Sequence, residues 1–371
     1  MKILHITNDY TGSKVYSNLV HSLDNLNVEQ KIYTPIRSKD LVGSNHIDLK
    51  TKNAEILYRP ILNKTDRVFF NKKIKKIVAD LVKNEYHRHV NITHAHTWYS
   101  DGAVAYELYK TYNIPYIIAI RSTDLNLFYK YALHLRRLGI NILNNALKVI
   151  FVSEIYKRRF FKLFDESYYE EKYLVIPNGV DDFWIQNSEQ RKRNIDETPQ
   201  LLYVGTFVKR KNIARLIRAV EYLNKEGTQC ELNLVGEGGK EERKIINLSK
   251  NIDFVSYHGK VNDKQELKKH YKKADIFAMP SKAETFGLVY IEALSQGIPI
   301  VFAENEGIDG FYDNIGEAVN CFDVDSIAKG IKKIIENYSC YSFKLEEILK
   351  NHNWSEIAKI YLSIYNNAIS K

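Results

Sequence analysis

The chain has 371 residues, of which 44% are hydrophobic and 27% charged, and its formal net charge is +9. This length exceeds what one small core needs and predicts two domains, and the composition is that of a globular protein. No apolar run approaches the roughly 20 residues that span a bilayer, and polar side chains interrupt the first strand too early for a signal peptide. The three cysteines are not in metal-binding spacing, so we expect a protein of the reducing cytoplasm.

Lysine and arginine gather in short clusters at 72–76, 136–137 and 157–159. Such clusters attract nucleic acid, an anionic membrane surface or the phosphates of a nucleotide. The chain has no zinc-finger or RNP-type pattern, so nucleic acid is the least favoured of the three partners. A solvated basic surface is the alternative interpretation of every cluster.

The N-terminal part of the chain alternates strands and helices. An apolar strand at 2–7 is followed by a loop with Gly12 and a helix to about residue 26, which is how a nucleotide-type α/β unit begins. No GxGxxG pattern is present, and this counts against a nicotinamide-dependent dehydrogenase. Short strands at 30–34 and 54–58 and a basic helix at 66–86 follow.

Two histidines lie at the end of the strand that closes at residue 96. Because side chains alternate along a strand, His94 and His96 share a face. Such a pair suits a metal ion, but no third ligand lies nearby in the sequence, and we predict no metal site. We interpret His94 as structural, whereas the ordinary pKa of a histidine suits His96 to proton contacts.

The next strand, at 115–120, leads into Arg121 and Asp124. An arginine at a strand end can bind a phosphate or carboxylate through two parallel hydrogen bonds, and an Arg–Asp pair that only pins the loop is the alternative. A helical pattern at 127–148 has one apolar face, and the segment 157–164 adds basic and aromatic side chains. Contact with an anionic membrane would explain both, and core packing is the simpler explanation of the apolar face.

Strands at 148–153 and 173–177 complete this part, and the second one runs into the sequence IPNGVD at 176–181. Asn-Gly marks a tight turn whatever the function. Residues 187–199 are polar and charged, as expected of a linker between domains.

The second part begins with a strand at 201–205 and a basic loop that contains Arg210 and Lys211 and opens a helix. A basic loop before a helix start suits a diphosphate, and a solvated charge run is the alternative. Further strands are predicted at 231–235 and 255–259. Gly236 and Gly238 follow the first of them, and Lys260 and Val261 follow the second. Glycines there let the backbone approach a ligand closely.

The most informative stretch is PSKAETFGLVYIEALSQGIPIV at 280–301, in which Glu284 and Glu292 are eight residues apart. A helix is predicted from Leu288 to about residue 296, because the glycine and proline that follow are ordinary stop signals. Phe286, Gly287 and Leu288 place free N–H groups at the helix start, which favours an anion between the two acids.

This stretch, with PS before it, FG inside it and G-x-P-x-V after it, resembles the E-x7-E signature of retaining glycosyltransferases of family 4, the group 1 family with the GT-B fold. IPNGVD and the Arg–Lys loop are similar to the same family. The resemblance implies an α/β protein with two Rossmann-like doubly wound domains facing a cleft. It places an acceptor-binding domain at 1–183, a linker at 184–198, a nucleotide-sugar-binding domain at 199–353, and a last helix at 354–371 that crosses back to the first domain.

The resemblance also implies roles for particular residues. Glu284 would hold the donor sugar together with His96, Glu292 would hold the ribose, and the phosphates would lie on Arg210, Lys211 and the helix start at 286–288. The remaining candidates would bind the donor or the acceptor: Gly12 the diphosphate or the acceptor, Arg121 and Asp124 the acceptor, Gly236 and Gly238 the nucleotide or sugar, and Lys260 and Val261 the base. The chain departs from the family pattern in having a single glycine at 12, Thr206 after the glycine of the basic loop, and arginine at 121.

The implied reaction moves a hexosyl unit from a nucleotide diphosphate sugar, with uridine favoured over guanosine, to a hydroxyl, with retention and without a metal or other cofactor. The expected acceptor is a glycan, protein or lipid-linked molecule in cell-surface polysaccharide or glycan synthesis, and a cytoplasmic protein at the inner membrane face fits this role. A nucleotide-sugar epimerase on the same fold and a non-catalytic GT-B partner subunit are the alternatives. The D-x-D at 323–325 precedes a helix, and we interpret it as an N-cap rather than a metal site.

Overall fold

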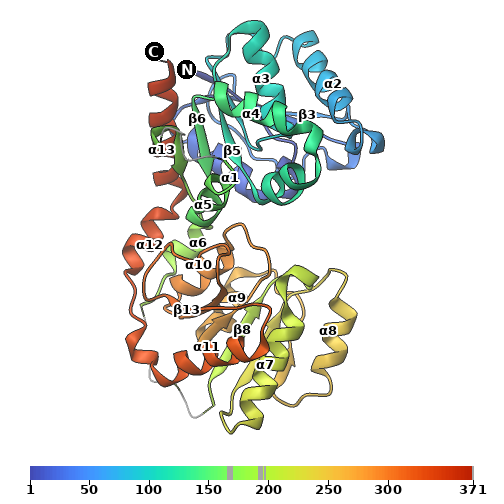
Figure 1. The fold of residues 1–371 in the computed structure, drawn as a ribbon. Coiled ribbons are helices and arrows are strands. Elements are labelled where there is room, and N and C mark those ends of the chain that lie inside the picture. Colours follow the sequence, from blue (N-terminus) through green and yellow to red (C-terminus); the bar gives the residue numbers. More distant parts are fainter. Residues whose placement is uncertain (165–169, 191–194, 196–197, 370–371) are drawn as a thin grey trace. The chain divides into compact units, whose positions relative to one another are not determined.

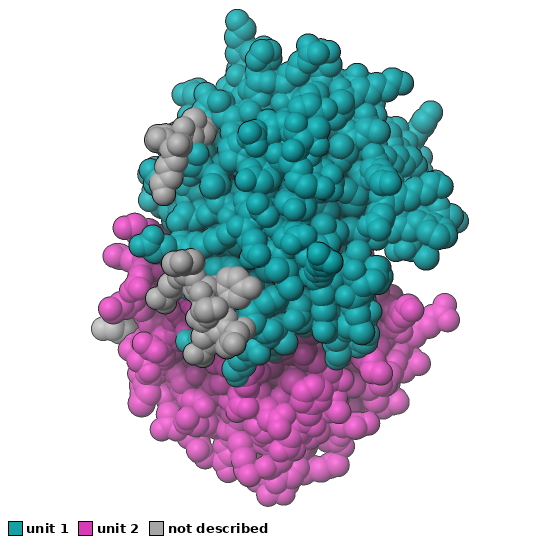
Figure 2. All heavy atoms as spheres, turned by 45° about the horizontal axis from the view of Figure 1, so that its top comes forward, with its two compact units in different colours: residues 1–152, 156–179, 354–371 teal, residues 153–155, 180–353 magenta. Residues whose placement is uncertain are grey.

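The computed structural model describes residues 1–164, 170–190, 195 and 198–369, so part of the predicted linker lies outside the described residues. The chain divides into two compact units, coloured separately in Figure 2. Unit 1 consists of residues 1–152, 156–179 and 354–371, and unit 2 of residues 153–155 and 180–353.

Within the described residues, unit 1 is built on a seven-stranded parallel sheet in the order β3-β2-β1-β4-β5-β6-β7. Its strands are β1 (Lys2–Ile6), β2 (Glu29–Pro35), β3 (Glu55–Arg59), β4 (Ile92–Ala95), β5 (Tyr116–Ile120), β6 (Lys148–Phe151) and β7 (Tyr173–Val175). The α-helices around it are α1 (Lys14–Asp24), α2 (Phe70–Lys83), α3 (Ser100–Tyr112), α4 (Arg136–Asn145), α5 (Glu154–Phe161) and α13 (Trp354–Ile369).

Both faces of this sheet are covered, which explains why its inner strand β5 is a continuous apolar run. Successive residues of a strand point to opposite faces. Thus Leu4 joins an apolar cluster with α2, α3 and α4, whereas Ile3 joins a second cluster with α1 and α13. The last helix, red in Figure 1, therefore belongs to unit 1 although it ends the chain. Gly179 is required beside it, because a Cβ there would lie 2.5 Å from the ring of Trp354.

The described part of unit 2 contains a six-stranded parallel sheet in the order β10-β9-β8-β11-β12-β13. The strands are β8 (Gln200–Val204), β9 (Glu231–Val235), β10 (Val255–Tyr257), β11 (Ile276–Ala278), β12 (Ile300–Ala303) and β13 (Gly316–Val319). The helices are α6 (Asp182–Gln186), α7 (Ile213–Lys225), α8 (Glu242–Ser249), α9 (Lys264–Lys273), α10 (Leu288–Ser295), α11 (Val324–Glu336) and α12 (Leu345–Asn351).

The strand order of each sheet reverses direction at one place. In unit 1 the reversal lies between β1 and β4, and in unit 2 between β8 and β11. Loops that leave the carboxyl ends of two such strands diverge, and the crevice between them is where open α/β sheets bind ligands. The expected ligand-binding loops are therefore those after β1 and β4 in unit 1, and those after β8 and β11 in unit 2.

One predicted helix is interrupted. The segment 127–148 forms the end of a π-helix (Asp124–Tyr129), a 3-10 turn (Leu133–Leu135) and then α4. Ala132 leaves the helical region with φ −94° and ψ 64°, and this breaks the continuous pattern. Leu135 is buried, as the amphipathic period predicts, whereas Tyr131, which the same period places on the apolar face, is exposed.

The D-x-D segment behaves as expected of a helix start. The side chain of Asp323 accepts a hydrogen bond from the backbone N–H of Asp325 at 3.1 Å and caps α11. This confirms the N-cap interpretation. Among the described helices, none has the length and apolar character that a bilayer crossing needs.

Candidate active site

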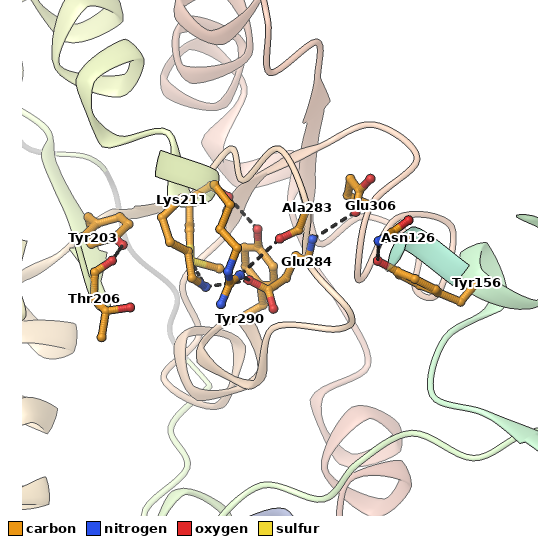
Figure 3. A network of polar contacts seen from close by, with 11 residues as sticks. Asn126, Tyr156, Tyr203, Thr206, Lys211, Ala283, Glu284, Tyr290 and Glu306 are labelled. Atoms are coloured by element: carbon orange, nitrogen blue, oxygen red, sulfur yellow. Dashed lines mark hydrogen bonds and ion pairs between the residues drawn. The ribbon is translucent and has the colours of Figure 1, made fainter. Parts of the chain in front are cut away.

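The loops after β8 and β11 bring Arg210, Lys211 and Glu284 together. Figure 3 shows Lys211 beside Glu284. The Glu284 carboxylate accepts a hydrogen bond from the Lys211 ammonium at 2.5 Å and one from the Arg210 guanidinium at 3.1 Å. Lys211 is buried and also lies 3.2 Å from the sulfur of Met279, whereas the Arg210 side chain is half-exposed. Three of the predicted catalytic residues therefore form one cluster at the strand reversal of unit 2.

The backbone of the two loops is tied together around this cluster. Asn212 takes a left-handed conformation at φ 64° and donates from its side chain to the carbonyls of Pro280, at 3.1 Å, and Cys321, at 2.6 Å. The N–H of Lys282 donates to the Arg210 carbonyl at 2.7 Å. These bonds fix the basic loop against the end of β11, so the cations are held in place by the backbone.

The charges of the cluster do not cancel, because Arg210 and Lys211 share the carboxylate of Glu284. Burial lowers the pKa of Lys211, and Glu284 acts in the opposite direction. Removing charges from water strengthens their interactions. A cluster with surplus positive charge at a strand reversal is suited to an anionic ligand such as a diphosphate.

The start of α10 lies directly behind Glu284. Gly287 is the N-cap residue with φ 86°, and a Cβ there would lie 2.6 Å from the ring of Tyr290 and 3.1 Å from Cγ of Glu284. The Tyr290 hydroxyl donates to the carbonyl of Met279 at 2.5 Å. Only glycine fits this turn, and it sets Glu284 and the helix N-terminus side by side.

The other two residues of that helix start have packing roles. The Phe286 side chain is buried, with its ring 5.3 Å from the ring of Phe311 and 4.8 Å from that of His352. Leu288 is partly buried against the core of unit 2. What these residues can offer to a ligand is therefore their backbone and not their side chains.

Sequence reasoning missed Glu306. Its carboxylate accepts a hydrogen bond from the N–H of Glu284 at 2.9 Å (Figure 3), and the neighbouring Gly307 approaches the Phe286 carbonyl. An acid followed by glycine in the segment after β12 was the available signal. Its contact was not predictable, because residue 306 is distant in sequence from the loop that it supports.

Glu292 lies in α10, and its carboxylate accepts a hydrogen bond from the Tyr271 hydroxyl at 3.0 Å. The pKa of Glu292 is raised to about 7, mainly by burial and also by Asp181, while the Tyr271 hydrogen bond and Lys264 act in the opposite direction. The contact found for Glu292 is thus with α9. The structure gathers Arg210, Lys211 and Glu284 but gives Glu292 a separate partner.

The loops after β9 and β10 bring together the candidates for nucleotide binding. The Gly236 N–H donates to the Gly259 carbonyl at 2.8 Å, and Lys260 pairs with Glu237 at 3.0 Å. A Cβ at Gly236 would lie 1.9 Å from the Gly205 carbonyl, and Gly238 accepts from Phe207 at 2.8 Å. Close backbone contact therefore connects these loops to the basic loop. Val261 is partly buried against the core.

In unit 1, strands β1 and β4 and the residue directly after β4 carry a group of buried histidines. His96 is buried, and its Nε2 lies 3.0 Å from Nδ1 of His5, which is on the neighbouring strand. The His94 Nδ1 lies 2.7 Å from the hydroxyl of Tyr365 in α13. Burial lowers the pKa of His5 to about 3 and the pKa values of His94 and His96 well below 6.5. All three imidazoles are neutral at physiological pH.

These histidines are also the residues that suit a metal ion. Ligand atoms of His5, His94 and His96 lie within 4.8 Å of one another. The expectation that no third ligand lies near His94 and His96 is therefore wrong, because β1 pairs with β4 in the sheet and brings His5 beside them. The rings of His94 and His96 stack with centroids 4.0 Å apart, so their in-plane nitrogens do not converge on one point. The absence of a metal site stays a prediction.

Arg121 connects His96 to the IPNGVD turn. Its side chain donates to the His96 carbonyl at 3.3 Å and to the side-chain oxygen of Asn178 at 3.2 Å. The Asp124 carboxylate instead accepts from three backbone N–H groups, those of Trp98, Tyr99 and Arg121 itself. Burial raises the pKa of Asp124 to about 6. Asp124 therefore holds the loop in place, as the alternative interpretation expects, but it does so through backbone N–H groups and not through a pair with the Arg121 side chain.

Gly12 lies in a tight turn against Asp9. A Cβ at Gly12 would lie 2.4 Å from the Asp9 carboxylate, whose pKa is raised by burial and lowered by Arg121. Asn8 donates to the buried carboxylate of Asp101. The loop after β1, Arg121 and His96 therefore form one polar group in unit 1.

Two family profiles match consecutive parts of the chain. Residues 12–182 match the profile described as Glycosyltransferase Family 4, and residues 185–359 match the one described as Glycosyl transferases group 1. An uncharacterized glycosyltransferase of Methanocaldococcus jannaschii is 26% identical over 81% of this chain and 80% of its own length. Alpha-monoglucosyldiacylglycerol synthase of Acholeplasma laidlawii is 24% identical over 80% of this chain and 77% of its own length.

Among solved structures, sucrose-phosphate synthase from Thermosynechococcus elongatus matches with a TM-score of 0.77 and 20% identity, over 100% of this chain and 99% of that one. The two doubly wound units therefore have the GT-B fold. The chain belongs to the group 1 glycosyltransferases of the family 4 type. The predicted GT-B fold of two Rossmann-like units and the family resemblance are confirmed, and the protein is a transferase of the kind that uses nucleotide-sugar donors.

Proposed function

We propose that this glycosyltransferase moves a hexosyl unit from a nucleoside diphosphate sugar to an acceptor hydroxyl with retention at the anomeric carbon and without a metal. The supporting observation is the cluster of Arg210, Lys211 and Glu284 at the strand reversal of unit 2. Uridine is the favoured base by analogy with the family. The cluster supplies surplus positive charge where a departing diphosphate needs it.

In this proposal the donor exchanges partners with Glu284. Without a ligand, the carboxylate of Glu284 holds Arg210 and Lys211. The diphosphate takes over both cations, assisted by the N–H groups at Gly287, and Glu284 then accepts hydrogen bonds from the hydroxyls of the donor sugar. Because Lys211 is buried, its interaction with a phosphate is stronger than it would be in water.

The nucleotide would be held by residues outside this cluster. Glu292 would accept hydrogen bonds from the ribose, which its protonated and ionised forms can both do through an unprotonated oxygen. Gly236 and Gly238 would let the backbone approach the nucleotide or the sugar, and Lys260 and Val261 would contact the base. The bond between the Gly236 N–H and the Gly259 carbonyl supports this, since it places both loops at one edge of the sheet.

Retention would follow from attack on the face that the phosphate leaves. The bond between the anomeric carbon and the phosphate oxygen breaks, the acceptor oxygen bonds to that carbon, and its proton passes to an oxygen of the departing phosphate. Neutral His96 would contact the sugar as a hydrogen-bonding group and not as a cation. Arg121 and the Gly12 loop would contact the acceptor, and Asp124 would hold the Arg121 loop in place.

We also propose that the acceptor is a glycan or a lipid-linked molecule of the cell surface. The relative from Acholeplasma laidlawii carries a glycolipid in its name, alpha-monoglucosyldiacylglycerol synthase. Unit 1 has an exposed apolar surface that would suit a lipid environment. The exposed fractions of the residues that form it are 77% for Val68, 58% for Phe69 and 67% for Tyr131. The rings of Phe70 and Phe128 lie 6.0 Å apart and join the two segments that carry it.

This surface has basic neighbours in sequence, such as Arg67 and Lys130, as interfacial proteins do. We propose that it rests on an anionic bilayer. The test is cosedimentation with phosphatidylcholine vesicles with and without phosphatidylglycerol. Phe69→Ser together with Tyr131→Ser should reduce binding to the anionic vesicles, and Tyr112→Ser, at another exposed aromatic residue, is the matched control. Equal binding by all three proteins would contradict the membrane proposal.

The first experiment on the function is calorimetric titration with UDP, GDP and ADP, before and after addition of Mg²⁺. Metal-free binding of one nucleotide identifies the base and supports the proposal, and binding that needs the metal contradicts its metal-independent form. Acceptor-dependent release of the nucleotide then separates a transferase from an epimerase. Failure of all three nucleotides to bind would favour a non-catalytic partner subunit.

A further inference from the structure

A second cationic site lies in unit 2, between the starts of α7 and α8. It is a pocket of about 240 Å³, smaller than the roughly 300–1,000 Å³ of pockets that hold drug-sized ligands. Its polar lining comes from three places: Lys209 with Asn212, Arg215 and Arg218; Glu241 with Lys244; and Lys282 after β11. A pocket of this size suits a small ligand or a single headgroup.

The lining is strongly basic. Among the described residues, five cations line the pocket, and Glu241 is the one carboxylate that lines it. Glu241 lies 3.6 Å from Lys244, and Arg215 donates to the side-chain oxygen of Asn212 at 3.1 Å. Like charges gathered at a concave surface repel one another and raise the local concentration of anions. This repulsion is visible at Lys282, whose pKa is lowered by burial and then by Arg215 and Lys209.

This pocket is distinct from the candidate donor site. Arg210, Lys211 and Glu284 are not among its lining residues. The two sites share a backbone, however: Lys209 directly precedes Arg210, and the N–H of Lys282 donates to the Arg210 carbonyl. A ligand in the pocket would therefore contact the loop that also carries the donor-site cations.

We propose that this pocket binds a phosphate group, carried either by a small soluble compound or by an anionic lipid. Arginine side chains give planar hydrogen-bond donors that match phosphate oxygens, and lysines add point charges. Arg215 and Arg218 stand on one face of α7, three residues apart, and Lys244 faces them from α8. The proposal does not depend on the transferase chemistry, because it uses none of the donor-site residues.

The test uses pyrophosphate as the probe, titrated calorimetrically into four full-length proteins. These are the wild type, Lys211→Met to disable the donor site, and two variants made in the Lys211→Met protein, namely the double variant Arg218→Glu with Lys244→Glu, and Arg243→Glu as the control. Arg243 is an exposed cation next to Lys244 that does not line the pocket. Circular dichroism checks that each variant folds, and Lys282→Gln replaces the double variant if that one does not.

We expect pyrophosphate binding to survive in Lys211→Met and in Arg243→Glu, and the affinity that remains in Lys211→Met to fall at least about tenfold when the pocket charges are reversed. Pyrophosphate binding that vanishes completely in Lys211→Met would overturn the proposal, since the donor site would then be the only phosphate site. Loss in Arg243→Glu equal to that in the double variant would also overturn it, because a general charge effect would explain the binding.

Vesicles distinguish the two sources of the phosphate. Phosphatidylcholine vesicles with phosphatidic acid are cosedimented with Lys211→Met and with the double variant. Weaker vesicle binding by the double variant assigns the pocket to a lipid headgroup, whereas equal vesicle binding with impaired pyrophosphate binding assigns it to a soluble phosphate. If the double variant is unchanged with both probes, the pocket is not a phosphate site, and the proposed transferase function is unaffected.

Discussion

Replacing Glu284 by glutamine should destabilise unit 2, because it leaves the ammonium of Lys211 buried without its carboxylate. Breaking a buried ion pair by removing one partner typically costs about 3–5 kcal/mol. The side chains of Lys211 and Glu284 keep 10% and 12% of their exposure, and this places the expected loss at the lower end, roughly 3 kcal/mol. For a unit of this size, about 3 kcal/mol lowers the melting temperature by roughly 6–12 °C.

The assay is urea and thermal unfolding of Glu284→Gln, Lys211→Met and the double variant. Because the double variant removes the charge together with its partner, its stability should return to within about 1 kcal/mol of the wild type. Pyrophosphate should stabilise Glu284→Gln more than the wild type, since the anion replaces the missing carboxylate. Far-UV circular dichroism shows whether each variant is folded before the comparison.

Two results would refute this reasoning. A Glu284→Gln protein within about 0.5 kcal/mol of the wild type would behave like an ordinary surface variant, so the pair would not be effectively buried. Strict additivity of the two single changes would mean that Lys211 and Glu284 do not interact energetically. Either outcome would also remove the argument that a diphosphate exchanges with Glu284.

Three further predictions concern backbone strain and pH. Gly287→Ala should cost roughly 1–3 kcal/mol in urea unfolding, since its Cβ meets Tyr290 at positive φ; Gly43→Ala, also at positive φ but with open space, is the control that isolates the collision. The folded pKa of His5 is depressed to about 3, so its contribution to stability is present above the unfolded value near 6.5 and is lost as the pH falls, by roughly 2 kcal/mol at pH 5. His5→Gln should flatten that acid limb, and an unchanged limb would contradict it. The folded pKa of Glu292 is raised to about 7, so its contribution is present below pH 4.5 and is lost as the pH rises through 7. Glu292→Gln should therefore gain stability at pH 8, and a loss there would show that its carboxylate is needed in the ionised form.

The sequence was sufficient for the fold because its elements are locally marked. The segment Glu231–Val235, bounded by a cysteine and a glycine, is the strand β9 with the bounds predicted, and Leu288–Ser295 differs from the predicted helix at one residue. Strands buried on both faces and helices with stop signals leave few alternatives. The interruption at Ala132 was missed because an amphipathic period persists across a break when both sides pack against the same core.

The candidate site was predictable only where it depends on local motifs. Arg210, Lys211 and Glu284 were found from two separate patterns, and the structure joins them because β8 and β11 are neighbours. The contact of His5 with His96 and that of Glu306 with Glu284 were not found. These pairs depend on strand pairing and loop return, and neither leaves a periodic mark in the sequence.

The ion cluster of unit 2 has a consequence for selectivity. Glu284 is tethered beside Arg210 and Lys211, so it is present there at a high effective concentration, and every incoming anion has to compete with it. Chloride offers a single charge and no shaped set of oxygens, and it gains too little to displace a hydrogen-bonded carboxylate. In the proposed function, a diphosphate would offer several oxygens to both cations and leave Glu284 free to receive a sugar. A site closed by its own counterion in this way would reject the abundant small anions of a cell by competition, without any movement of the fold.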